Sequence, residues 1–307
     1  MILSLQRIIV IGRNTLTEAI RQKVLSVLLI FAVVLVSCSV LVSQLATPSL
    51  DPAGLVDEQI KFVKDFGCGA IGLFGLAIAI LATGQLIPQE LDNRTIYTIL
   101  AKPVRRSEFL LGKFFGIVLL LLLCVTLMSL AFCAALYWQE QQGIAVADSW
   151  YSDVSHGKED VFLAEKYKED VAEIRGQVRD PRLIEAVLLI FAKLVMTTGI
   201  ALLISTFASS AIFTIVTTFM IYLIGHLEGS AREFWLSHGA ETTLWQGALV
   251  GFISLLIPDL NSFTIVDEIL AGNNVPWHHA FDLLGYAGIY LVVLLSVSIV
   301  IFDYREI

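Results

Sequence analysis

The residue pair Gly112-Lys113 matches the Gly-Lys of a phosphate-binding loop. A phosphate-binding loop needs GxxxxGK followed by Ser or Thr, because backbone N–H groups cradle the phosphates and the hydroxyl binds Mg²⁺. Here Phe114 follows the lysine, and position 107 is Ser instead of Gly. We therefore predict that this chain does not bind ATP through such a loop.

Other reactive side chains are also poorly placed for catalysis. His278 and His279 are adjacent, so on a helix they diverge by about 100°, and no Cys or Glu completes a ligand spacing. No Ser-His-Asp or Cys-His arrangement can be assembled on one face. The sequence predicts neither a metal site nor an enzyme.

The most informative polar segment covers residues 88–113. Pro88 suits a first helical position, and Glu90 and Asp92 complement the positive end of a helix dipole. Pro103 should end the helix, which predicts a short two-faced helix over 88–101. Glu90 has a simpler interpretation as a solvated surface carboxylate.

Composition shows what must position this segment. The chain has 307 residues, 57% hydrophobic and only 16% charged, against about 25% charged in soluble domains. A membrane-spanning helix needs about 20 apolar residues. Six stretches meet or nearly meet this length: 24–44, 66–87, 114–137, 186–208, 211–227 and 283–302. We predict an all-α integral membrane protein with six transmembrane helices.

Charge predicts the orientation. With six spans, the loops on the side of the termini hold 10 Lys and Arg in about 55 residues, and the other loops hold 9 in about 120. The positive-inside bias then places both termini in the cytoplasm, in a multi-pass protein of the cytoplasmic (inner) membrane.

The predicted organisation has four parts. Residues 1–23 form an amphipathic interface helix, or simply extend the first span. Residues 24–137 hold spans one to three with the short helix at 88–101. Residues 138–185 form a charged extracytoplasmic insert, whose apolar positions from Ala164 to Val178 predict a helix that packs on the protein or contacts a partner. Residues 186–307 hold spans four to six and an apolar run at 244–257, which is short enough to be re-entrant or interfacial.

Two features within the spans bear on transport. Gly75, Ala79 and Thr83 share one ridge of the second span, which favours close helix packing over a binding site. Lys193 is the lone charge inside a span, and we interpret it as an interfacial lysine that extends outward. An ion-coupled secondary transporter needs titratable groups near the midplane, so this class is disfavoured.

The segment after the second span resembles the signature of ABC-2 type permeases. The matching residues are Glu90, Thr95, Leu100, Pro103, Arg106, Gly112 and Lys113. Further similarity lies at 201–210, 224–227, 257–263 and 302–305, and it looks like the subgroup of multi-copper-enzyme maturation permeases.

The resemblance implies the membrane subunit of an ABC exporter. It implies a coupling helix between spans two and three, an outer re-entrant segment, and a dimer with a second permease copy or a homologous permease. Separate ATPase subunits would bind ATP and Mg, so no cofactor is expected in this chain. The implied coupling residues are Glu90, Leu91, Thr95, Leu100, Pro103, Arg106, Gly112 and Lys113.

The resemblance also implies a substrate path between spans two and five. The residues assigned to this path or to an interface are Gly72, Gly75, Ala79, Thr83, Thr214, Thr217 and Thr218. These spans offer hydroxyls and no charged cavity, which suits a lipid-like, peptide or otherwise amphipathic cargo. An alternative function is a non-transporting membrane subunit that assembles with an extracytoplasmic partner; the bilayer is expected to surround the chain, and no nucleic acid is expected to bind.

Overall fold

The fold is seen in a computed structural model that describes residues 2–43, 52–92, 105–155, 161–237, 258–270 and 276–304. Within these ranges the regular structure is helical and no β-strand occurs. The elements are α1 (Ile2–Ile20), α2 (Lys23–Ser43), α3 (Pro52–Gly84), α4 (Leu86–Asp92), α6 (Arg106–Ser155), α7 (Val161–Val178), α8 (Arg182–Phe207), α9 (Ala211–Ser237), η2 (Asn261–Thr264), α11 (Ile265–Leu270) and α12 (Trp277–Tyr304).

The membrane character of the helices is confirmed. Five helical stretches are long and apolar enough to cross a bilayer: Lys23–Ser43, Val56–Pro88, Arg106–Val154, Val161–Phe207 and Trp277–Tyr304. The predicted fifth span, Ala211–Leu227, is a shorter apolar stretch at the start of α9. The chain is therefore an all-α membrane protein with five long apolar helices and one shorter one among its described residues.

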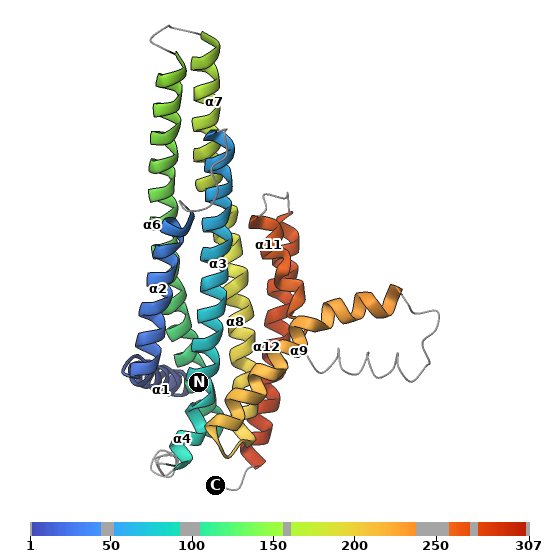
Figure 1. Cartoon of the computed structure of the whole chain (residues 1–307). Helices are drawn as coiled ribbons and strands as arrows, with labels where there is room; N and C mark the ends of the chain where they lie inside the picture. The colour runs from blue at the N-terminus through green and yellow to red at the C-terminus, as the bar shows by residue number, and fades with distance from the viewer. Residues whose placement is uncertain are drawn as a thin grey trace.

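Helices α3 and α8 form the centre of the bundle (Figure 1). Their most apolar windows are 67% and 61% buried, whereas those of α2 and α12 are 28% and 17% buried. Helices α2 and α6 pack on α3, and α9 and α12 pack on α8. The outer faces of α2 and α12 expose large apolar side chains, among them Phe31 and Val292, as expected of surfaces that contact lipid.

Helix α6 extends well beyond the bilayer. Its 50 residues correspond to about 75 Å, compared with a hydrocarbon core of about 30 Å. Hydropathy places the end of the third span near residue 138, but α6 continues without a break beyond it. The helix continues because α7 packs on its later part. Helix α7 returns along it, and the two form a helical hairpin at one end of the molecule (Figure 1). We call this the hairpin end, and the opposite end, with α1, α4 and the last turn of α12, the terminal end.

Polar contacts hold the base of the hairpin. Glu140, only 1% exposed, accepts a hydrogen bond at 2.9 Å from Arg179, the residue just after α7. Gln177 donates to Asp57 of α3 at 2.6 Å, and Gln139 donates to Gln59 at 2.8 Å. Beside them, the apolar face of α7 buries Ile174 and Val178. The predicted helix in the insert thus packs on α6 and α3.

Helix α1 crosses the first turns of α6 along a glycine seam. A Cβ at Gly116 would lie 2.6 Å from the carbonyl oxygen of Gly12, and a Cβ at Gly112 would lie 2.8 Å from Ile11 Cβ. The two backbones can approach this closely only because these positions lack side chains. Leu5 and Ile9 of α1 remain exposed, which agrees with a helix lying at a membrane surface.

Helix α9 is longer than the apolar run that predicts it. Figure 1 shows that it changes direction and that its later part leaves the bundle. The carbonyl of Gly225 accepts a hydrogen bond from the Leu260 backbone N–H at 3.0 Å. A Cβ on Gly225 would lie 2.8 Å from the Pro258 carbonyl oxygen. This close approach places η2 beside α9, and α11 packs on α8 and α3. The predicted re-entrant run at 244–257 lies outside the described residues.

Candidate functional site

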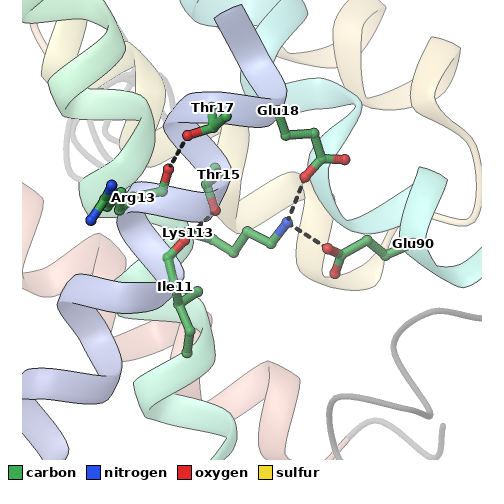
Figure 2. A network of polar contacts seen from close by, with 7 residues as sticks. All are labelled: Ile11, Arg13, Thr15, Thr17, Glu18, Glu90 and Lys113. Carbon is green, nitrogen blue, oxygen red and sulfur yellow. Dashed lines mark hydrogen bonds and ion pairs between the residues drawn. The ribbon is translucent and has the colours of Figure 1, made fainter. Parts of the chain in front are cut away.

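The terminal end carries a buried ion-pair network centred on Lys113, in the second turn of α6. The Lys113 side chain is only 3% exposed. Its ammonium lies 2.5 Å from Glu90 Oε1 of α4 and 3.7 Å from Glu18 Oε2 of α1. Figure 2 shows one lysine reaching both carboxylates. A single cation therefore ties together the segment after α3, the start of α6 and the N-terminal helix.

The position of Glu90 affects its titration. Burial raises the pKa of the Glu90 carboxyl above its ordinary value of 4.5, although the attraction of Lys113 and the hydrogen bond to it act in the opposite direction. Glu18 adds a smaller increase because it is a second carboxylate near the same lysine. The charged form of Glu90 is thus held mainly by Lys113, and losing that lysine would leave a buried carboxylate poorly compensated.

A second polar contact joins α1 to α6. Glu108 Oε2 accepts hydrogen bonds from Arg7 Nη1 and from the backbone N–H of Arg105, each at 3.4 Å. The contact to Arg105 is one half of a capping box, since the third helical residue satisfies the N–H just before the helix. Glu108 therefore fixes the start of α6 and holds α1 against it.

Arg106 joins the end of α12 to the start of α6. Its Nη1 donates to the carbonyl oxygens of Phe302 and Asp303 at 3.0 and 3.1 Å. Arginine suits this position because the final carbonyls of a helix have no partner within it. The rings of Phe109 and Phe302 stack beside it with centroids 6.1 Å apart. The end of α12 is thereby joined to α6.

The structure brings together half of the predicted coupling residues. Glu90, Arg106, Gly112 and Lys113 meet where α1, α4, α6 and α12 converge. Leu91 lies in α4, while Thr95, Leu100 and Pro103, and most of the predicted helix at 88–101, lie outside the described residues. The Glu90 carboxylate faces inward onto Lys113, so in this chain it is not a solvated surface group.

Sequence reasoning did not assign Arg7 and Glu18 to this site. Both lie on the polar side of the N-terminal amphipathic helix, where helical spacing predicts exposed polar residues and names no partner for them. A signal was present in retrospect, because a carboxylate among the arginines of that face suits a basic partner. Only packing shows that the partner is Lys113, 95 residues further along the chain.

The predicted path residues divide into packing and lining positions. Gly75 faces Leu194 of α8 with no room for a side chain, and Ala79 and Thr83 are fully buried. Thr83 Oγ1 donates to the Ala79 carbonyl at 2.7 Å. Thr218 of α9 donates to the Thr214 carbonyl at 2.7 Å, and Thr214 donates at 3.2 Å to the carbonyl of Ser210, just before α9. Thr217 is half-buried. The hydroxyls of Thr83, Thr214 and Thr218 thus bond to carbonyls one turn earlier in the chain.

A cavity of about 920 Å³ opens between α3, α8, α9 and the η2–α11 segment. Of the predicted path residues, Gly72 lines it. Lys193 also lines it, with its ammonium 5.4 Å from the centre of the Tyr222 ring. Lys193, which the sequence predicts to be an interfacial lysine, thus lines a cavity between the helices.

Comparison with known families decides the class of protein. The family model described as "ABC-2 family transporter protein" matches residues 9–307, nearly the whole chain. This chain belongs to the ABC-2 transporter family. No curated protein matches it in sequence.

The ABC-2 assignment identifies the kind of subunit. Proteins of this family are membrane subunits, generally without catalytic activity, and they pair with an ABC ATPase. The chain is accordingly a multi-pass membrane protein and an ABC transporter permease. Among the described residues, no group of three or more His, Cys, Asp or Glu is arranged to hold a metal ion.

Proposed function

We propose that the chain is the permease subunit of an ABC exporter, located in the inner membrane with both termini in the cytoplasm. A separate ATPase subunit would bind ATP and Mg below the terminal end, and a second permease copy or a homologous permease would complete the transporter. The observation that carries this proposal is the Lys113 network, which joins the segment after α3 to α1 and α6.

The network suits the transmission of movement. An ATPase that pushed on the segment between α4 and α6 would act on Glu90, which is 9% exposed and held by Lys113. Lys113 would pass the displacement to α6 and, through Glu18, to α1. Arg106 would carry it to the end of α12. Glu90 then serves as a positioning residue inside the permease instead of a direct ATPase contact.

The proposal is tested by purifying the chain with its ATPase after mild solubilisation. We expect the ATPase to remain bound and its ATP hydrolysis to increase in the complex. Glu90→Ala should lower that stimulation by about tenfold or more, since it strands a buried lysine. Glu90→Gln should retain more of it, because the amide oxygen can still accept a hydrogen bond from Lys113.

The matched control is Glu165→Ala, which removes an exposed carboxylate of α7 at the hairpin end. This variant should leave ATPase stimulation unchanged. Absence of a bound ATPase from the wild-type preparation, even after crosslinking, would overturn the permease proposal. It would instead favour a non-transporting membrane subunit.

A further inference from the structure

The cavity beside α3 spans the depth of one membrane leaflet. Its lining on α3 runs from Lys61 to Leu76, a rise of roughly 22 Å. A leaflet with its interfacial region is also about 20–22 Å deep, which is half of a bilayer of roughly 40–45 Å. The Lys61 end lies at the base of the hairpin, because Gln59, two residues earlier, bonds to Gln139 there. The cavity therefore begins near the membrane surface on the hairpin side and extends toward the middle of the bilayer.

Glycines keep part of this space open. A Cβ built on Gly69 or Gly72 meets no atom within 4 Å, although both residues lie on the central helix and line the cavity. In contrast, Gly75 of the same helix is pressed against Leu194 of α8. Gly69 and Gly72 are not required for such close packing, so these two positions leave volume that a side chain would fill.

The charged groups of the lining do not select a charged ligand. Lys61 pairs with Asp57 at 2.7 Å. Lys193, Asp65 and His226 each have interactions of their own within the protein. With Lys61 paired, Lys193 and Asp65 leave no excess of either sign. Recognition of a ligand must therefore come from the shape of the cavity and from its apolar surface.

The apolar part of the lining is open to the surrounding lipid. Leu73 of α3 is 63% exposed and Phe219 of α9 is 42% exposed, although both line the cavity. Apolar side chains that remain exposed on membrane helices contact lipid. The buried residues Ile190, Leu194 and Val266 form the inner wall behind them. Hydrocarbon from the bilayer can therefore enter between α3 and α9 and reach α8.

A lipid fits this space better than water does. Apolar walls that face a void lose dispersion contacts, and the cavity measures about 920 Å³. Water needs two to four polar partners, but from residue 69 onward the lining of α3 consists of glycine and leucine only. Nearer the hairpin, the same helix contributes Lys61 and Asp65. A lipid has the same order, with a polar head at the membrane surface and hydrocarbon below it.

We propose that the cavity binds one lipid of the leaflet on the hairpin side, with a hydrocarbon chain between α3, α8 and α9 and the head near Lys61. The binding site follows from the geometry of the cavity, whereas the assignment of this lipid as cargo rests on the proposed transport function. Local sequence could not show the site, because Gly72, Leu194 and Phe219 come from three helices that only the fold brings together.

The test counts bound lipids by native mass spectrometry of the full chain, purified with its ATPase in a neutral detergent and stripped of lipid. The probe is a phosphatidylcholine with one palmitoyl and one oleoyl chain. We expect one such lipid per chain to bind, at least about tenfold more tightly than to Gly72→Phe, whose ring fills the cavity. Gly72→Leu, a smaller change at the same position, should weaken binding less. A phosphatidylglycerol with the same chains should bind within about fivefold of the phosphatidylcholine, because the head charge does not select the ligand.

The matched control is Gly288→Phe, which adds the same ring to an open glycine of α12 that does not line the cavity. This variant should bind the lipid like wild type. Absence of a bound lipid from the wild-type chain, or equal binding by wild type and Gly72→Phe, would overturn the inference.

Retention of the ATPase is scored in the same preparation and tests the proposed function separately. A bound lipid without a bound ATPase would leave the site standing and contradict the transport function. A bound ATPase with no lipid in the cavity would do the reverse.

Discussion

At the scale of single residues, Lys113 shows how one side chain can join three segments. Its ammonium meets carboxylates from α4 and α1, of which the sequence pattern marks Glu90 but not Glu18. A lysine that is 3% exposed needs such partners, because burying an unpaired ammonium costs several kcal/mol. The acidity of residues 18 and 90 is thus part of the fold at the terminal end.

We predict that Lys113→Met destabilises the protein by about 3–5 kcal/mol, because it leaves the buried Glu90 carboxylate without its cation. The double variant Lys113→Met, Glu90→Leu should recover much of that loss, since it removes both charges. The measurement is the unfolding free energy of the purified protein in detergent.

The control for this cycle is Lys166→Met, an exposed lysine of α7, which should change stability by less than about 0.5 kcal/mol. A double variant as unstable as the sum of the two single variants would show that Lys113 and Glu90 do not interact.

At the scale of elements, the glycines of α3 have two roles: some allow close helix packing and others border a cavity. Its glycines at 67, 75 and 84 admit side chains from α6, α8 and α9, whereas those at 69 and 72 border the cavity. The small-residue pattern predicted close packing, and the ridge at Gly75 does pack on α8. The pattern did not distinguish the two kinds of glycine, because that depends on which neighbour lies opposite each position.

We predict that Gly75→Leu and Gly72→Leu differ in stability although they lie one helical turn apart. Leucine at 75 must displace Leu194 from the α3–α8 contact, at a cost of about 1–3 kcal/mol. Leucine at 72 enters open space and should cost less than about 0.5 kcal/mol. Melting temperatures in detergent compare the two, and equal losses would contradict the assigned packing.

At the scale of the whole molecule, the two ends have different characters. The terminal end gathers α1, α4 and the last turn of α12 around basic residues, including Lys113 and Arg106. The hairpin end projects α6 and α7 beyond the bundle (Figure 1), and residues 138–185 hold more Asp and Glu than Lys and Arg. The positive-inside bias predicts that the terminal end faces the cytoplasm, the side proposed above for the ATPase.

Labelling of single cysteines tests this orientation. Each cysteine is introduced into a chain whose four native cysteines are replaced. Lys166→Cys, on exposed α7, should react with a membrane-impermeant maleimide added outside intact cells stripped of any outer envelope. Arg13→Cys, on exposed α1, should react only after permeabilisation. The opposite pattern would reverse the proposed orientation and place the Lys113 network on the outer side.

The sequence by itself determined the class of the protein, its apolar helices and the segment that marks the family. These properties are local, because hydropathy, charge bias and a short motif can each be recognised from residues that are neighbours in the chain. The residues at which α6 and α9 end could not be predicted from hydropathy. An apolar run ends at the membrane surface, whereas a helix can continue where other helices pack on it.

The tertiary structure alone decided which residues meet. Glu18 and Glu90 share Lys113 because α1 can cross α6 at a seam of glycines. Gly72 of α3, Lys193 of α8 and Tyr222 of α9 border one cavity because these three helices surround it. Both outcomes depend on the relative placement of whole helices. The physical reason is that ion pairing and cavity formation are properties of surfaces in contact, and a sequence pattern describes each surface alone.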